Sequence, residues 1–113
     1  MHEYSIVQAL VARVEGEARA RGATAVHRLS IRVGELSGVE PGLLETAYQT
    51  FRARTICQAA ALDLQIVAAR WACPGCGRAI GRGHLLRCPT CALPARLEQG
   101  DEIVLDRIEM EVP

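Results

Sequence analysis

The chain has 113 residues, half of them hydrophobic, and its thirteen arginines balance thirteen acidic side chains with no lysine present. This length fits one small domain, or one domain that carries a minor module. Zero net charge argues against a protein whose main task is binding nucleic acid. The start of the chain has no signal-peptide layout, and no apolar run approaches the roughly 18 residues of a membrane span. We therefore expect a cytoplasmic protein whose five cysteines are thiols or metal ligands rather than disulfides.

The first predicted element is a helix over residues 5–21, because its apolar residues recur at helical spacing. Ser5 with Gln8 forms a capping box at its start, or the helix begins a residue or two earlier. Gly22 ends it. Its buried face is expected to contain Val7, Leu10, Val11, Val14 and Ala18.

A strand follows in "AVHRLSIRVGEL", where apolar and polar residues alternate. His27 falls on the apolar side of this alternation, so we expect a packed, hydrogen-bonded core histidine. The second helix begins at Pro41, directly after Glu40, and ends near Arg54. Its apolar face is formed by Leu44, Ala47, Tyr48 and Phe51.

Two more strands are predicted, "ALDLQIVA" and, near the end of the chain, "DEIVLDRIEMEV". In the last strand Asp106 interrupts an apolar side otherwise formed by Val104, Ile108, Met110 and Val112. The fold class is α+β: two helices cover one face of a small three-stranded sheet. Residues 1–69 and 101–113 form this α+β domain, and residues 70–100 form an inserted four-cysteine module that is similar to a zinc ribbon.

The module reads "CPGCGRAIGRGHLLRCPTC", with two Cys-x2-Cys pairs, Cys73 with Cys76 and Cys88 with Cys91. Two such turns facing each other supply four thiolates in a tetrahedron, which suits zinc, and a site with four protein ligands has no position left for a catalytic water. A structural Zn²⁺ is therefore expected. Four-cysteine iron centres for electron transfer use similar turns and are the alternative.

Two further side chains in or near the module carry a metal-binding or thiol group. His84 lies between the cysteine pairs, where it is an exposed loop residue, replaces a cysteine as a ligand, or binds a second metal. Cys57 follows the second predicted helix and is expected to be a small buried thiol.

The chain opens with "MHEYS", which places an imidazole next to a free α-amino group. The α-amine of Met1, the backbone nitrogen of His2 and its imidazole can close fused rings around one metal in a plane. Nickel and copper favour such planar nitrogen ligands. Glu3 either adds an oxygen ligand or complements the positive end of the first helix. From the residues alone, a solvated terminus remains the ordinary alternative.

Four stretches in this order, "MHEYS", "RVGELSGVEP", "CPGC…CPTC" and "GDEIVLDRIEMEV", span the whole chain. Together they resemble the HypA/HybF family of hydrogenase nickel-incorporation proteins. The resemblance implies a nickel-binding α+β domain, a zinc-binding domain, and delivery of Ni²⁺ as cargo during maturation of nickel–iron hydrogenases. It also implies work with a HypB-type GTPase and the hydrogenase large-subunit precursor, and in some organisms with urease maturation proteins.

Carried over by position, the resemblance makes His2 the essential nickel ligand through its side chain and backbone nitrogen. Glu3 contributes its backbone nitrogen or modulates the site, and Glu40 lies near the nickel. Met1 completes the expected nickel site through its α-amine. The module cysteines match the zinc ligands.

The expected function is that of a carrier rather than an enzyme, because no nucleophile–base pair, phosphate loop or paired-carboxylate cleft is present in the sequence. Neither nucleic acid nor a membrane is an expected partner, and a homodimer is left open. The alternatives are a structural zinc-ribbon scaffold that only holds partners together, and a four-cysteine iron electron carrier.

Overall fold

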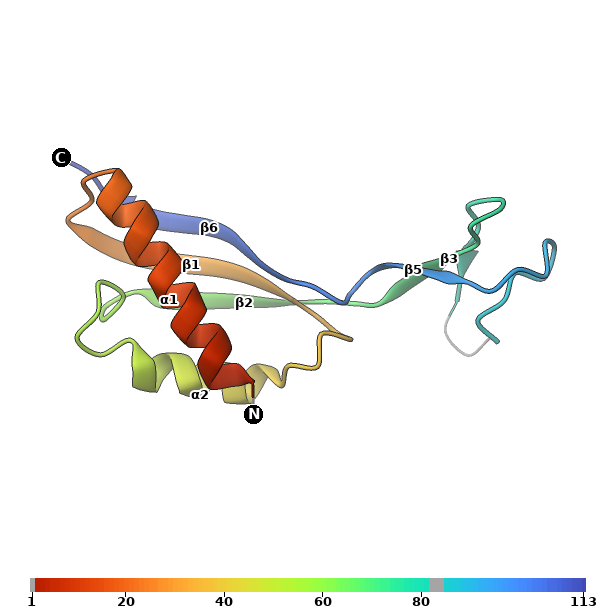
Figure 1. The fold of residues 1–113 in the computed structure, drawn as a ribbon, viewed down its shortest axis with the longest axis horizontal. Coiled ribbons are helices and arrows are strands. Elements are labelled where there is room, and N and C mark those ends of the chain that lie inside the picture. Colours follow the sequence, from red (N-terminus) through yellow and green to blue (C-terminus); the bar gives the residue numbers. More distant parts are fainter. Residues whose placement is uncertain (1, 82–84) are drawn as a thin grey trace.

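The structure is a computed structural model that describes residues 2–81 and 85–113. The described residues form two helices and six strands. The strands make two three-stranded sheets, one at each end of an elongated molecule of 56 × 29 × 17 Å (Figure 1). The elements are α1 (Glu3–Ala20), β1 (Ala25–Gly34), α2 (Pro41–Phe51), β2 (Ala61–Val67), β3 (Arg70–Ala72), β4 (Ala79–Ile80), β5 (Arg96–Gln99) and β6 (Ile103–Glu111). No helix in the described part of the chain is long and apolar enough to cross a membrane.

The larger sheet has the strand order β2-β1-β6 and, with α1 and α2, forms the large lobe. Strand β1 pairs with β2 in parallel and with β6 antiparallel. The parallel pair requires a crossover, which α2 supplies between the two strands. This arrangement confirms the prediction of two helices on a three-stranded sheet.

The core of the large lobe lies between the helices and the sheet. The predicted apolar faces of both helices are confirmed, because the side chains predicted for them are buried or packed against the core. Tyr48 is fully buried, and its hydroxyl donates to the carbonyl oxygen of Ala60 at 2.8 Å. Cys57 is also fully buried, as predicted.

The prediction of a buried His27 is wrong. Its side chain is 59% exposed, and its Nε2 lies 3.3 Å from a carboxylate oxygen of Glu111. The pairing of β1 with β6 shifts register between Val26 and Arg28, so one extra residue bulges from β1. Because the bulge resets the alternation, Val26 and Leu29 both face the core while His27 faces solvent.

A second bulge explains the irregular pattern of the last strand. Ser30 pairs with Arg107 while Ile31 pairs with Leu105, which leaves Asp106 without a Cα partner on β1. Leu105 therefore packs on the core in place of the predicted Val104, beside Ile108 and Met110. Val112, predicted on the same side, is 51% exposed.

The small lobe comprises the second sheet, with strand order β4-β3-β5 and antiparallel pairing throughout, together with the cysteine turns. These three short strands were not predicted from the sequence. Few residues are buried here: Ala72, Cys73, Ile80 and Cys88, with Trp71, Cys91 and Ala95 packed against the last three.

The two lobes meet where the chain leaves and re-enters the larger sheet. Gly100 has a φ of +107°, and a Cβ on it would lie 2.6 Å from the Cα of Ala69. Gly34 passes so close to Gly100 that a side chain would collide with its backbone. The Glu35 carboxylate accepts a hydrogen bond from the N–H of Ala69 at 2.7 Å. Close backbone contacts at the two glycines, together with this hydrogen bond to the Glu35 side chain, thus set how the small lobe joins the large one.

Candidate metal sites

The four module cysteines come together in the small lobe, as the sequence predicted. Their sulfur atoms all lie within 4.8 Å of one another, and the Sγ atoms of Cys76 and Cys88 are 3.8 Å apart. Four sulfurs at about 2.3 Å from a central zinc would be separated by about 3.8 Å in a tetrahedron. A disulfide would need about 2.05 Å, and all five cysteines are free. The cluster therefore has the size of a four-thiolate metal site.

Each cysteine pair is held by the same turn. In the first, the N–H of Gly77 donates to the carbonyl oxygen of Cys73 at 2.9 Å, and in the second the N–H of Ala92 donates to that of Cys88 at 2.9 Å. The residue after each pair is left-handed, with φ of +75° at Gly77 and +55° at Ala92. Gly75 lies against the cluster, since a Cβ there would lie 3.6 Å from the Sγ of Cys91 and 3.7 Å from that of Cys73, and it would collide with the Cδ1 of Leu93 at 2.9 Å.

The thiols of the cluster perturb one another strongly. A hydrogen bond from the backbone N–H of Cys91 is the main cause that lowers the pKa of Cys88 to about 6. Contacts with the sulfurs of Cys76 and Cys73, together with desolvation, raise the pKa of Cys91 to about 12. Four adjacent thiolates repel one another, so full ionisation requires a cation among them. The chemistry of this donor set fits a thiophilic divalent metal.

His2 stands at the start of the large lobe as the residue that precedes α1. Its backbone is helical, its carbonyl oxygen accepts from the N–H of Ile6 at 3.0 Å, and its side chain makes no capping hydrogen bond. The helix begins at Glu3, two residues before Ser5, which confirms the alternative prediction of an earlier start. Ser5 and Gln8 lie inside α1, so the capping box predicted for them is wrong. The imidazole is exposed.

Glu3 is the one buried charged residue in the described part of the chain, at 6% exposed. Its Oε2 accepts from the backbone N–H of Glu40 at 3.1 Å. Interaction with the positively charged amino terminus, followed by this backbone hydrogen bond, lowers the pKa of the Glu3 carboxyl to about 2. The carboxylate is directed to the start of α2 and stays ionised at neutral pH.

Glu40 caps α2. Its backbone is extended, its Oε2 accepts from the N–H of Leu43 at 2.6 Å, and Pro41 follows at the first helical position. Gly42 leaves room for this carboxylate, which a Cβ would approach to 3.1 Å. Glu3 and Glu40 are thus brought together from 37 positions apart, and the starts of both helices converge beside His2.

An aromatic contact that the sequence did not reveal joins the same two helices. The rings of Tyr4 and Phe51 pack edge to face, with centroids 5.4 Å apart and an interplanar angle of 85°. Helical spacing cannot predict it because Tyr4 is 52% exposed and lies off the buried face of α1.

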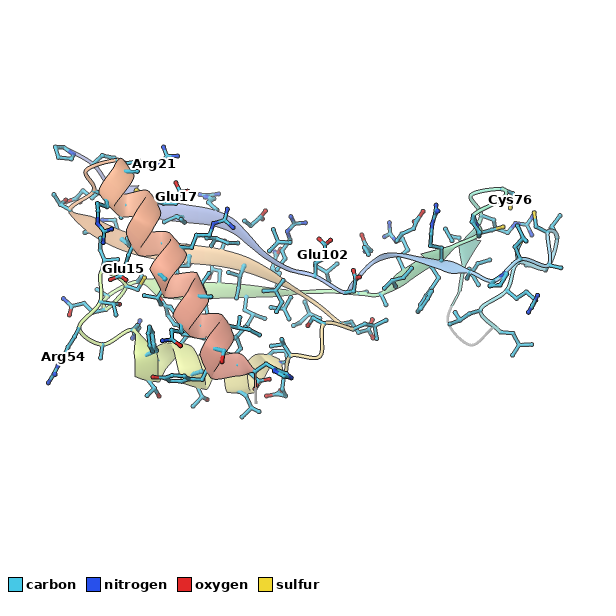
Figure 2. All side chains as sticks on the ribbon, viewed as in Figure 1. Glu15, Glu17, Arg21, Arg54, Cys76 and Glu102 are labelled. Carbon is cyan, nitrogen blue, oxygen red and sulfur yellow. The ribbon has the colours of Figure 1, made fainter. Side chains whose placement is uncertain are left out.

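The candidate sites lie in different lobes. Figure 2 shows Cys76 at the end of the molecule farthest from α1, whereas α1 begins beside α2 in Figure 1. Met1 and His84 lie outside the described residues. Among the residues that are described, the cysteines form the one cluster of three or more His, Cys, Asp or Glu side chains close enough to share a metal.

This geometry defines a two-lobed protein in which a four-cysteine lobe is carried on an α+β lobe with an exposed histidine before its first helix. The model of the family described as "Hydrogenase/urease nickel incorporation, metallochaperone, hypA" matches residues 1–110. The chain belongs to this family.

Relatives match over the full length. The hydrogenase maturation factor HypA of Shewanella baltica (strain OS185) is 41% identical, over 98% of this chain and 97% of the relative. That of Aquifex aeolicus (strain VF5) is 38% identical, over 99% of each. The solution structure of the Ni metallochaperone HypA from Helicobacter pylori covers 100% of both chains, with 30% identity and a TM-score of 0.74. A second HypA solution structure matches with 29% identity and a TM-score of 0.80, over 100% of this chain and 98% of the other.

Proposed function

We propose that this chain is a cytoplasmic nickel carrier that binds Ni²⁺ at its N-terminus and delivers it for maturation of nickel–iron hydrogenase. The observation that carries the proposal is the position of His2, exposed before α1 with its imidazole free of any capping role. The ligands are the α-amine of Met1, the backbone nitrogen and imidazole of His2, and the backbone nitrogen of Glu3. Four nitrogens in a plane suit Ni²⁺.

The surroundings of His2 favour deprotonated nitrogen ligands. The first N–H groups of a helix have no intrahelical partner and lie at the positive end of its dipole, which eases the loss of a proton. Two positive helix ends would repel a cation, but the carboxylates of Glu3 and Glu40 lie between them and offset that repulsion. In this proposal Glu40 acts through its charge near the nickel, while its carboxylate caps α2.

Terminal ligands also suit release. A carrier must give up its cargo, and an exposed site at a chain end can be dismantled without unfolding the lobe. Protons compete with the metal for amine, amide and imidazole nitrogens, so nickel affinity falls as pH falls.

In the small lobe, Cys73, Cys76, Cys88 and Cys91 bind a structural Zn²⁺. Few residues of this lobe are buried, and two of them, Cys73 and Cys88, are cysteines of the cluster, so the metal substitutes for a larger hydrophobic core. The division into a nickel-binding domain of residues 1–69 and 101–113 and a zinc-binding module of residues 70–100 follows from this assignment. The partners are a HypB-type GTPase and the hydrogenase large-subunit precursor, with urease maturation proteins as a second client system. The chain itself catalyses no reaction.

The test is a nickel titration of three zinc-loaded proteins: the unmodified chain, His2→Ala, and a chain extended by two residues before Met1. Extension keeps every side chain but converts the terminal amine to an amide. We expect both altered proteins to lose nickel binding while they keep one equivalent of zinc. The matched control is His27→Ala, which removes an exposed imidazole remote from the terminus and leaves binding intact. Unchanged affinity of His2→Ala would refute the proposal.

Elemental analysis of the purified protein tests the second metal. Zinc in a colourless protein supports the structural assignment, whereas iron in a reddish protein would favour an electron carrier. A protein that holds zinc but ignores nickel would be only a scaffold.

A further inference from the structure

Among the strands of the described residues, β6 is an edge of the larger sheet and pairs with β1 alone. The carbonyl oxygen of Glu111 accepts from the N–H of Thr24 at 2.8 Å, so it is directed toward the β1 side. Backbone groups alternate between the two sides of an antiparallel strand. The N–H and C=O groups of Ile108 and Met110 are therefore directed toward the open edge, where another strand could pair with them.

The core side of β6 is only partly covered. Helix α1 crosses the sheet obliquely, so its starting end lies toward α2 rather than over β6 (Figure 1). Two hollows of about 310 and 480 Å³ lie between α1 and β6, and Arg13 and Leu105 line both. We call them together the β6 groove; its apolar lining includes Ile6, Leu10, Ile103, Leu105, Met110 and Val112. Ile103 and Val112 remain 37% and 51% exposed.

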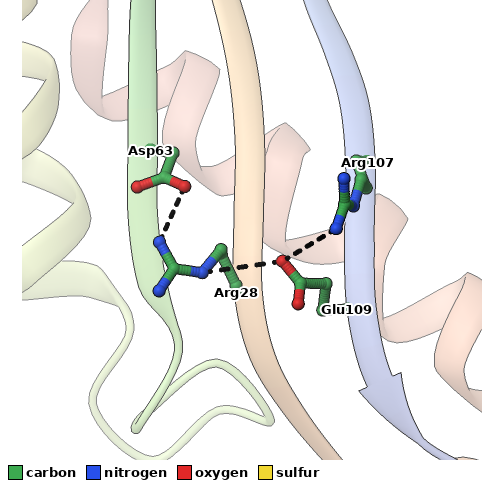
Figure 3. A network of polar contacts seen from close by, with 4 residues as sticks. All are labelled: Arg28, Asp63, Arg107 and Glu109. Carbon is green, nitrogen blue, oxygen red and sulfur yellow. Dashed lines mark hydrogen bonds and ion pairs between the residues drawn. The ribbon is translucent and has the colours of Figure 1, made fainter.

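The opposite face of β6 carries charges in a self-complementary order. Arg107 and Glu109 flank Ile108, and the Arg107 side chain is 70% exposed. A series of ion pairs crosses this face (Figure 3): Asp63 with Arg28 at 2.7 Å, Arg28 with Glu109 at 3.5 Å, and Glu109 with Arg107 at 3.6 Å. Arg107 is the last residue of this series and lies on the edge strand, where its guanidinium has further N–H donors available.

These charges select one register for pairing of β6 with itself. If two copies pair antiparallel about a two-fold axis at Ile108, Arg107 of each copy lies opposite Glu109 of the other. An axis at Glu109 would place two carboxylates opposite each other, and an axis at Arg107 would place two guanidinium groups there. Opposite charges in directly paired positions stabilise a sheet and like charges destabilise it, so the axis at Ile108 is favoured.

We propose that β6 pairs with β6 of a second copy of this chain, antiparallel about Ile108, to form one continuous six-stranded sheet. The apolar residues of both strands then lie next to each other and fill the two β6 grooves. Helix α1 begins on the β2 side of the sheet, and the cysteines lie in the other lobe (Figure 1). Pairing at the β6 edge therefore leaves both candidate metal sites open.

Sedimentation velocity over a concentration series tests this pairing with the full-length, zinc-loaded chain. We expect a monomer–dimer equilibrium in the unmodified protein. Arg107→Glu or Glu109→Arg alone should raise the dissociation constant roughly ten- to thirtyfold, because two cross-strand pairs per interface change from attractive to repulsive. The double variant, with the charges exchanged, should recover most of the affinity. Arg96→Glu, an exposed charge reversal on β5 in the small lobe, is the matched control and should leave the dissociation constant unchanged.

Hydrogen exchange supplies a measurement that does not depend on the variants. The amides of Ile108 and Met110 should exchange more slowly as the unmodified protein is concentrated, while amides at the free edge of β2 should not. A chain that stays monomeric at every concentration would overturn the proposal, as would a dimer indifferent to both single charge reversals. Protection of the β6 amides only after another protein is added would also overturn it and assign this edge to a strand of that protein.

Discussion

The two cysteine turns can be compared directly, because the same left-handed backbone position is glycine in one turn and alanine in the other. Gly77 and Ala92 each follow a Cys-x2-Cys pair and have φ of +75° and +55°. A side chain in this conformation costs about 1–2 kcal/mol. Glycine loses more freedom on folding, which offsets about 0.5–1 kcal/mol of the gain. We therefore expect Ala92→Gly to stabilise the small lobe by about 0.5–1 kcal/mol.

The reverse change is the matched control. A Cβ on Gly77 would meet no atom within 4 Å, so Gly77→Ala adds conformational strain without a clash. It should destabilise the small lobe by about the same 0.5–1 kcal/mol. The opposite signs of the two substitutions separate backbone strain from any general effect of changing the turn.

Trp71 makes the assay specific for this lobe. It is the only tryptophan in the chain and belongs to β3, beside the cysteines. Its fluorescence during guanidinium unfolding of the zinc-loaded protein should move to higher denaturant for Ala92→Gly and to lower denaturant for Gly77→Ala. Because metal binding and folding of this lobe are coupled, competition with a chelator should show a two- to fivefold change in the same directions. If both substitutions shift the midpoint the same way, the strain argument is refuted.

Three further predictions concern the large lobe and the junction. Tyr48→Phe should lower the free energy of unfolding in urea by about 1 kcal/mol, because a buried hydrogen bond is lost. Burial raises the pKa of Tyr48 to about 12, so the contribution of this residue to stability decreases as pH rises from about 10. The variant should show a smaller decrease of stability over that pH range. The Glu3 pKa of about 2 lies below its ordinary 4.5, so its contribution is present above pH 4.5 and lost toward pH 2, and Glu3→Gln should show a smaller loss of stability in acid. Gly100→Ala should destabilise the protein by about 1–3 kcal/mol, because its Cβ would collide with Ala69, and small-angle scattering should show altered packing of the two lobes. Gly16→Ala is the control: a Cβ there meets open space on α1, so this variant should stabilise the protein by up to about 1 kcal/mol.

The regular elements were predictable because each depends on local spacing. The buried faces of α1 and α2 follow a helical period that is legible in the sequence, and both were confirmed. The cysteine cluster was predictable for a similar reason, since two matching pairs can close around one metal without knowledge of the rest of the fold.

The strand faces were predictable only in part, because a bulge is a property of the pair of strands. Simple alternation placed His27 in the core and Val104 on the buried side of the last strand. The extra residues at His27 and Asp106 shift the register of β1 against β6, and each shift turns the following side chains to the other face. Neither strand has a local sequence pattern that predicts these register shifts.

By itself, the sequence determined the two helices, the three long strands, the four-thiolate cluster and the family. Each of these follows from residues that are adjacent or regularly spaced within a short stretch of the chain. The tertiary structure alone decided that Glu3 contacts the start of α2, that His27 faces solvent, and that β6 is an open edge with a groove beside it. These features depend on contacts between segments tens of residues apart, where side-chain periodicity carries no information about which backbone lies alongside.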